Sequence, residues 1–357
     1  MWNNTPVTKI LKIKLPIIQA PMAGGITTPK LVANVSNAGG LGTLGAGYMS
    51  PEEIKKNIRK IRTLTNKPFA VNLFIPETPY VPKEQLRTMI STLKKSFPAI
   101  TKKIQPVKPP YMPSFDEQIK VIIAEKVPVF SFTFGVLEEK WIEKLKANKI
   151  KIIGTATTAS EAALLEFEGV DLVIAQGYEA GGHHGNFMET TGSSLIGTFA
   201  LIPQLLTHVN IPVIAAGGIM DARGILAAMT LGAEGVQMGT AFITCPESGA
   251  SSQYKNRLLK LREDHTTLTR AFSGKLARCV KNKFTMQMKI FQHQFLDYPA
   301  QNALTKQLRE TAEKKDLADY SSFYAGQGAC MSQGLTADKL IKQLNKGVTQ
   351  LIKRIKL

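Results

Sequence analysis

Two adjacent histidines stand in a glycine-rich stretch, where few neighbouring side chains would block access to a reactive group. The stretch AQGYEAGGHHGNF, residues 175–187, follows an apolar run and holds His183 and His184. Because repeated glycine disfavours helices and strands, we expect a loop whose backbone approaches a ligand. A histidine there can be a base, a hydrogen-bond donor, a metal ligand or an ordinary polar residue with its hydrogen bonds satisfied. We predict no metal site, because no further His, Cys, Asp or Glu stands beside the pair at a ligand spacing.

Glycine-rich turns end two later apolar runs. AAGGIMDARG places Gly217 and Gly218 between an apolar run and a helical pattern, and QMGTAF places Gly239 and Thr240 likewise. Glycine lets the backbone approach a ligand, and the amides at the start of the next helix can hold a phosphate. Either turn alone is equally typical of tight strand–helix packing. The two turns together favour a phosphate site.

Polar amides end other apolar runs. Asn72 and Gln176 stand at two such ends, and the turn APMAGG at 20–25 adds bare backbone at a third. These groups suit a flat heterocycle with polar edges, so flavin mononucleotide (FMN) fits the pattern. The cluster NAGGLGTLGAG joins a helix to a strand, which is the wrong order for a dinucleotide-binding turn.

Eight short apolar runs alternate with helical patterns, and these elements must position the polar residues. This alternation is typical of parallel βαβ units, and eight units close a (β/α)8 barrel. A doubly wound open sheet is the competing layout, but it would concentrate the unusual residues near one switch point. The runs, in chain order, are PIIQAPMAGG, LGTLGAG, PFAVNLF, VPVFSFTFG, KIIGTAT, LVIAQGYEAGG, PVIAAGG and GVQMGTAF.

The alternation is interrupted once and then stops. We predict an α/β fold in which residues 1–75 and 114–245 form the barrel and residues 76–113, rich in Pro and Lys, form an insertion. Residues 246–357 are expected to form a smaller, mostly helical second domain that contributes to the substrate pocket. Its closing amphipathic segment is expected to pack on the barrel rather than lie on a membrane.

The chain has 357 residues and a formal net charge of +18. Its basic residues are spread through amphipathic segments without interleaved aromatics, so a role in nucleic-acid binding is not expected. Three widely spaced cysteines favour a reducing compartment. No long apolar span or secretory signal is visible, and we therefore predict a cytoplasmic protein without a membrane span.

Several segments together resemble nitronate monooxygenase of class I, also known as 2-nitropropane dioxygenase. They follow the family's order through nearly the whole chain. The two terminal ones favour this family over flavin-dependent enoyl-ACP reductases, which carry a similar EAGGHHG motif. The segments are QAPMAGGITTPKLVANVSNAGGLGTLGAGY, PFAVNLFIP, AQGYEAGGHHGNF, PVIAAGGIMDARGILAAMTLGAEGVQMGTAF, AFSGKLARCVKNKF and DYPAQNALTKQLR.

The resemblance implies an FMN enzyme on a (β/α)8 barrel. It makes His183 the catalytic histidine and leaves His184 outside the pocket or at its rim. The flavin contacts that it implies, together with the glycine turns, are Met22, Ala23, Gly24, Asn72, Gln176, Gly181, Gly217, Gly218, Gln237, Met238, Gly239 and Thr240.

The reaction implied by the resemblance is oxidative denitrification of alkyl nitronates with O2, with propionate 3-nitronate as the expected substrate. Tyr298 and Lys306 match positions that the family associates with substrate, and Tyr111 and Tyr254 are further candidates. His183 is expected to position the nitro group or to remove the α-proton of a neutral nitroalkane. The alternative is an NAD(P)H-dependent enoyl-ACP or quinone reductase on the same barrel. We expect a monomer or homodimer acting on small molecules.

Overall fold

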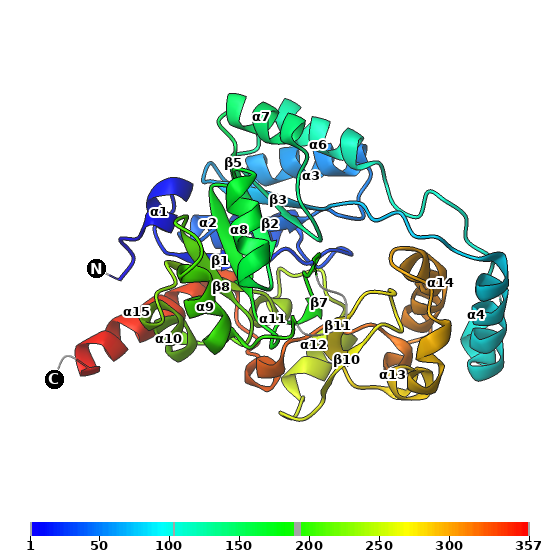
Figure 1. The fold of residues 1–357 in the computed structure, drawn as a ribbon. Helices are drawn as coiled ribbons and strands as arrows, with labels where there is room; N and C mark the ends of the chain where they lie inside the picture. Colours follow the sequence, from blue (N-terminus) through cyan, green and yellow to red (C-terminus); the bar gives the residue numbers. More distant parts are fainter. Residues whose placement is uncertain (1, 103, 189–193, 356–357) are drawn as a thin grey trace.

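Eight parallel strands form a closed barrel (Figure 1). The computed structural model describes residues 2–102, 104–188 and 194–355. The sheet order is β1-β9-β8-β6-β5-β4-β3-β2, and a parallel bridge between Ile18 and Leu41 joins its two ends. The predicted barrel is therefore confirmed, and the open sheet is excluded. The strands are β1 (Ile17–Gln19), β2 (Gly42–Gly45), β3 (Phe69–Phe74), β4 (Val129–Thr133), β5 (Lys151–Ala156), β6 (Leu172–Gln176), β8 (Val213–Ala216) and β9 (Gly235–Met238).

Amphipathic helices cover the outside of the barrel. The helix that follows β2 shows why they form: Ser50 and Glu53 cap its first turn reciprocally, and Ile54, Ile58 and Ile61 bury one face. Such capping satisfies amides that have no partner within the helix, and the buried face supplies the packing energy. The helices are α2 (Pro29–Asn37), α3 (Pro51–Leu64), α6 (Phe115–Ala124), α7 (Glu139–Ala147), α8 (Ala159–Phe167), α9 (Thr198–Leu206), α10 (Ala222–Thr230) and α11 (Thr240–Ile243).

Both ends of the described chain pack on the barrel. Helix α1 (Pro6–Leu11) adds Val7 and Leu11 to the cluster of strand residues that contains Ile18. Helix α15 (Ala337–Ile355) lies against α2 and α10 and buries the apolar stripe that includes Leu340, Ile341 and Leu344. The closing segment packs on the barrel, as expected. No helix in the described part of the chain is both long and apolar enough to cross a lipid bilayer.

A second unit lies to one side of the barrel (Figure 1). We expected it to be mostly helical, but it also contains a three-stranded antiparallel sheet of order β10-β11-β7. Strand β7 comes from the barrel loop after β6, so the sheet joins two parts of the chain that are far apart in sequence. The elements are β7 (Gly182–His183), α12 (Ser252–Leu259), β10 (Thr266–Thr269), β11 (Ala277–Val280), α13 (Lys283–Met288), η1 (Lys289–Gln294), α14 (Ala300–Lys314), η2 (Ala318–Tyr320) and η3 (Gln327–Met331).

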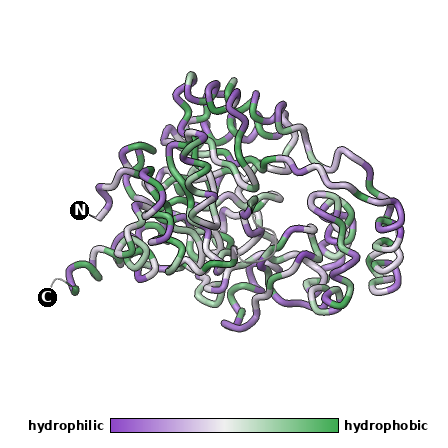
Figure 2. The backbone as a smooth tube through the Cα atoms, viewed as in Figure 1, coloured by the Kyte–Doolittle hydropathy of each residue, from purple (hydrophilic) through white to green (hydrophobic). Residues whose placement is uncertain are grey.

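The segment that interrupts the barrel pattern packs into this second unit. It forms α4 (Lys83–Ser96) and α5 (Pro98–Thr101), whose residues Met89 and Leu93 join Phe272 and Leu308 in one buried cluster. In Figure 2 green apolar backbone dominates the barrel, whereas the outlying helix α4 is largely purple and white. The second unit therefore has its own apolar core, assembled from the insertion and the C-terminal region.

Candidate active site

His183 is held where the barrel meets the second unit. Strand β7 pairs antiparallel with β11, so that His183 lies opposite Ala277. Gly182 precedes it with a φ of 79°, a conformation that glycine adopts without strain. The imidazole Nε2 lies 2.8 Å from the Ser273 hydroxyl. The loop after β6 is thereby fixed at both its backbone and its histidine side chain.

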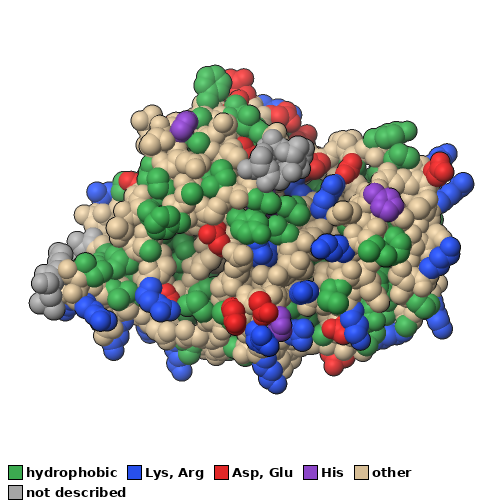
Figure 3. Space-filling model, turned by 60° about the horizontal axis from the view of Figure 1, so that its bottom comes forward, with side chains coloured by type: hydrophobic (Ala, Val, Ile, Leu, Met, Phe, Trp, Pro, Cys, Tyr) green, Lys and Arg blue, Asp and Glu red, His purple; other side chains and the backbone are tan. Residues whose placement is uncertain are grey.

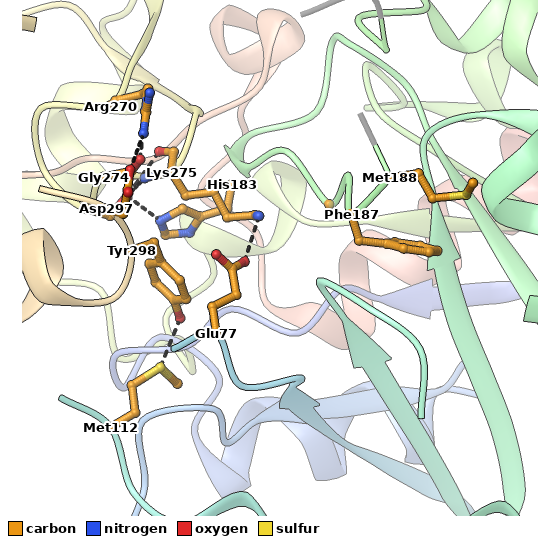
Figure 4. Close-up of polar contacts among 12 residues, drawn as sticks. Glu77, Met112, His183, Phe187, Met188, Arg270, Gly274, Lys275, Asp297 and Tyr298 are labelled. Carbon is orange, nitrogen blue, oxygen red and sulfur yellow. Dashed lines mark hydrogen bonds and ion pairs between the residues drawn. The ribbon is translucent and has the colours of Figure 1, made fainter. Parts of the chain in front are cut away.

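Aromatic rings surround the imidazole. The ring centroids of Tyr324, Tyr298 and Phe134 lie 5.2, 5.8 and 5.8 Å from that of His183. Figure 4 shows Tyr298 beside His183, with its hydroxyl directed towards Met112. Phe134 has a φ of 79°, which side chains rarely adopt, and strained backbone of this kind is often found at functional sites. These rings lower the polarity around the imidazole, which remains partly accessible.

The imidazole is neutral at physiological pH. Burial, followed by the positive charges of Lys275 and Arg309, lowers the pKa of His183 from its ordinary value of 6.5 to about 3. The Ser273 hydroxyl can donate its one proton to the Lys275 carbonyl at 3.1 Å. In that arrangement Nε2–H donates to Ser273, and the other ring nitrogen, Nδ1, is left as a proton acceptor.

His184 points into protein, away from the rings that surround His183. It is buried, and its Nε2 donates to the Ser194 carbonyl at 3.1 Å. Burial lowers the pKa of its imidazole as well. His184 therefore ties the start of the loop to the residues that precede α9, and we assign it a structural role.

The predicted glycines, and Gly182 beside them, fall into two groups according to the space around them. A side chain at Gly24 or Gly182 would meet nothing within 4 Å, so open space lies in front of that backbone. A Cβ at Gly181 would lie 2.4 Å from the Gly326 amide nitrogen, so Gly181 is needed for close packing of the chain. Gly217 and Gly218 have φ values of 116° and 71°, as a sharp turn after β8 requires.

The two predicted side-chain amides differ in whether they have a free hydrogen-bonding atom. Gln176 accepts from the Gly185 amide at 2.6 Å and donates to the His183 carbonyl at 3.2 Å, so it shapes the loop. Asn72 donates to the Ser131 hydroxyl at 3.0 Å, but its buried Oδ1 has no partner among the described residues. An unpaired buried acceptor at the end of a barrel strand is suited to a ligand donor.

The other predicted cofactor residues lie at the carboxyl ends of β1 and β9, which are neighbours. Gln237 and Met238 pair with the last two residues of β1, and Met22 and Ala23 follow that strand in the turn after it. Gly239 and Thr240 continue β9 into α11, and the Thr240 hydroxyl accepts from the Gly326 amide at 3.0 Å. The strand pairing thus brings two segments more than 200 residues apart to one rim.

The four predicted substrate residues are not brought together. Tyr298 lies beside His183, whereas the Lys306 side chain is 68% exposed and 3.9 Å from Glu310. Tyr254 is buried, donates its hydroxyl to the Tyr324 carbonyl and stacks on Phe323. Tyr111 packs at the edge of the second unit's apolar core. Of the four, Tyr298 alone is in ring contact with His183.

Several residues beside His183 were not predicted as site residues. Ser273 and Lys275 come from the segment before β11, and Arg309 comes from α14. The Tyr48 hydroxyl lies 3.3 Å from that of Tyr298, and Tyr324 contacts the imidazole. Apart from Ser273 and Lys275, they come from separate segments of the chain, so no spacing in the sequence marks them as neighbours of His183.

Lys275 joins the second unit to the barrel. Its Nζ lies 2.8 Å from Glu77 Oε1 and 4.8 Å from the centroid of the Phe134 ring. Figure 4 shows Lys275 reaching across to Glu77. The Lys275 side chain is 14% exposed and that of Glu77 is 35% exposed, so this ion pair is partly shielded from water. Within the described residues, no cluster of three His, Cys, Asp or Glu could hold a metal ion.

Comparisons with known proteins agree over almost the whole chain. The sequence profile of the nitronate monooxygenase family matches residues 4–347. A probable nitronate monooxygenase of Staphylococcus saprophyticus is 46% identical over 356 residues, which cover 99% of this chain and 100% of that protein. A probable nitronate monooxygenase of Staphylococcus haemolyticus is 44% identical, covering 99% of each.

Solved structures show the same architecture. A nitroalkane oxidase from Streptomyces ansochromogenes is 36% identical with a TM-score of 0.90, covering 98% of this chain and 99% of that one. FabK from Thermotoga maritima is 33% identical with a TM-score of 0.78, covering 99% and 98%. The profile match and the identities over full length show that the chain belongs to the nitronate monooxygenase family and is an oxidoreductase.

Proposed function

We propose that the chain is an FMN-dependent nitronate monooxygenase that oxidises alkyl nitronates beside His183. The observation that carries the proposal is that the candidate site residues follow the carboxyl ends of the barrel strands. In a chain of this family, the turns after β1, β8 and β9 and the His183 loop after β6 all follow the carboxyl ends of parallel strands. In (β/α)8 barrels that rim holds the active site, and the loops after the last two strands commonly bind phosphate.

The residues at this rim fit a flavin nucleotide. We propose that the backbone amides of the turns at Gly217–Gly218 and Gly239–Thr240 hold the phosphate, because these turns follow the last two barrel strands and lead towards α10 and α11. The open space before Gly24 and the unpaired Asn72 Oδ1 suit the ring and its polar edge. When bound, the flavin supplies the chemistry of taking an electron from the nitronate and passing one to O2.

Because His183 is neutral, its role differs between a neutral nitroalkane and a nitronate anion. A nitroalkane must lose its α-proton, and Nδ1 can accept it, but an imidazolium beside Lys275 and Arg309 is costly. A nitronate has already lost that proton, and the same two cations attract it. We therefore propose that nitronates are better substrates than neutral nitroalkanes, with His183 as the base for the latter.

The proposal is tested on the protein as purified. We expect a yellow protein that releases FMN on denaturation and consumes O2 with propionate 3-nitronate without added nicotinamide. Nitrite and the carbonyl product should appear with the O2 loss. A colourless protein that consumes no O2 with any nitronate would contradict the proposal. We further propose a cytoplasmic role in nitronate detoxification, as a monomer or homodimer.

The alternative is a flavin reductase, which the similarity to FabK favours. Such an enzyme takes hydride from NAD(P)H and delivers it to an enoyl thioester or a quinone. The two functions separate cleanly, because a reductase oxidises NADH in the presence of crotonyl thioester or quinone. We expect this rate to be negligible beside the rate of nitronate oxidation.

A further inference from the structure

Arg278 carries a buried positive charge without a partner of opposite sign. It stands on β11 and is only 3% exposed. In the described part of the chain its guanidinium forms no ion pair with a carboxylate, and its hydrogen bonds go to Tyr178 and Thr266. Burying a charge is costly unless it is paired. An apolar side chain would fill the same volume at a lower cost, which indicates a specific role for the guanidinium.

The guanidinium is directed from the second unit towards the barrel loop after β6. Neighbouring residues of a strand point to opposite faces, and Cys279, next to Arg278, packs in the second unit's apolar core. Arg278 points the other way, where its Nε and Nη2 both donate to the Tyr178 carbonyl, at 3.2 and 3.0 Å. Its guanidinium carbon also lies 4.4 Å from the centroid of the Tyr178 ring. One side chain thus holds both the backbone and the ring of Tyr178.

The loop that Arg278 holds carries two groups that the proposed reaction needs. Gly181, a predicted flavin contact, and His183 both follow Tyr178 closely in this loop. Gly182, between them, pairs with Arg278 in the sheet β10-β11-β7. The side chain of Arg278 therefore holds the start of residues 178–182, and its backbone holds their end. A change in Arg278 acts on the flavin contact and on the histidine at once.

We propose that Arg278 is a positioning residue that fixes the loop 178–182 and thereby couples flavin binding to the orientation of His183. The inference rests on the proposed function and adds a residue that acts through this loop. A guanidinium suits the task, because its planar fork donates two hydrogen bonds while its face stacks on an aromatic ring. A lysine ammonium has the charge but neither the fork nor the flat face.

The first measurement is FMN affinity, by fluorescence titration of the flavin-free protein. Arg278→Lys should raise the Kd for FMN on the order of tenfold, because a hydrogen bond to a charged group is lost from the loop. Arg278→Met also removes the charge and should raise the Kd at least as much. Arg257→Lys changes an exposed arginine in the last turn of α12 and is the matched control, with an unchanged Kd. Melting temperatures without FMN show that each variant is folded.

The second measurement separates positioning of His183 from general stability. Oxygen uptake by the FMN-saturated protein is measured with nitroethane and with ethylnitronate. Arg278→Lys should lower kcat for nitroethane about tenfold with little change in KM, because proton removal depends on the placement of the base. The kcat for ethylnitronate should fall less than about threefold, because no proton has to be removed. A loss of stability alone would not distinguish the two substrates.

Tyr178 tests the partner of Arg278 directly. Tyr178→Leu removes the ring from the stack and should raise the Kd for FMN about threefold. In the Arg278→Lys background the same change should add little, because the stack is already lost and the two effects are not additive. Tyr178→Phe keeps the ring and should lie closer to the wild type than Tyr178→Leu does.

The outcomes are distinct. A raised Kd for FMN together with a selective loss on nitroethane in Arg278→Lys supports the coupling. A lower melting temperature with both readouts as in the wild type, or a change in only one of them, overturns the coupling while leaving the proposed function intact. If Arg278→Met does not fold, Arg278→Lys and Tyr178→Leu still decide the matter. If the wild type binds no FMN and oxidises no nitronate, the proposed function is rejected, and the coupling is rejected with it.

Discussion

At the scale of single residues, His183 and His184 are neighbours with opposite surroundings. Successive side chains of an extended segment point to opposite faces, and His183 is the last residue of β7. One imidazole therefore faces Tyr298 and Tyr324, and the other is buried against Ser194. Both are kept neutral by burial, but only His183 lies between the barrel rim and the second unit.

Replacing His183 by asparagine should separate proton removal from electron transfer. With a neutral nitroalkane, His183→Asn should lower kcat/KM on the order of 100-fold or more, as loss of a general base does. With the preformed nitronate, the loss should stay below about tenfold, because no proton has to be removed. Oxygen uptake with matched nitroethane and ethylnitronate measures both. Equal losses for the two forms would contradict a role as base.

The low pKa of His183 also makes stability depend on pH. The pKa is about 3 in the folded protein and near 6.5 when the chain unfolds, so the unfolded state binds more protons between these values. Stability is therefore lost as pH falls through this window. Relative to His183→Asn, the wild type should lose about 2 kcal/mol of unfolding free energy between roughly pH 7 and pH 4.5. Urea unfolding of both proteins at the two pH values measures this, and a constant difference would argue against the shifted pKa.

His184 should matter for stability and not for chemistry. His184→Ala leaves the Ser194 carbonyl without its donor and opens space in a buried region, which should cost about 1–3 kcal/mol. Activity per folded, FMN-loaded molecule should remain close to that of the wild type. Urea unfolding and oxygen uptake on the same preparation test this. Unchanged stability with lost activity would move His184 into the reaction.

At the scale of elements, a two-residue strand carries much of the site's organisation. Strand β7 attaches the loop after β6 to β11, and Arg278 of β11 donates to the Tyr178 carbonyl of that loop at 3.0 Å. Arg278 also lies over the Tyr178 ring. The barrel supplies the turns and the second unit supplies Ser273, so His183 is positioned only when the two are joined.

The turn after β1 offers a test of the proposed flavin site. Gly24 has a φ of 82° and faces open space, so Gly24→Ala would place a methyl group where we propose the ring. Gly39 has a φ of 99°, and the nearest atoms to a Cβ there belong to the Lys14 side chain, which makes Gly39→Ala a control for backbone strain. Both variants should cost about 1 kcal/mol of stability. Only Gly24→Ala should lower FMN affinity, measured by fluorescence titration, and equal affinities would move the flavin away from this turn.

At the scale of the whole molecule, periodic features could be predicted from the sequence and long-range ones could not. The eight strands were predictable because each is a short apolar run followed by a helical pattern, and most of the runs end at or near Gly, Asn or Gln. The sheet β10-β11-β7 was not, because its shortest strand is two residues of a glycine-rich loop. Lys275 and Arg309 escaped prediction because they reach His183 through tertiary packing.

The net charge of +18 is a property of the whole surface. On the face shown in Figure 3, blue Lys and Arg side chains are scattered among apolar and acidic ones and form no single stripe. A scattered positive charge attracts small anions in general and defines no docking site. It is compatible with an anionic substrate. Lys275 and Arg309 add positive charge near His183, where we propose that the substrate binds.

The most direct test of the account is anaerobic rapid mixing of the purified protein with one candidate reductant at a time. Propionate 3-nitronate should bleach the flavin absorbance within the time of a turnover, and admission of O2 should restore it. NADH should bleach it far more slowly. Rapid bleaching by NADH, with none by the nitronate, would contradict the assignment and identify the protein as a reductase on the same barrel.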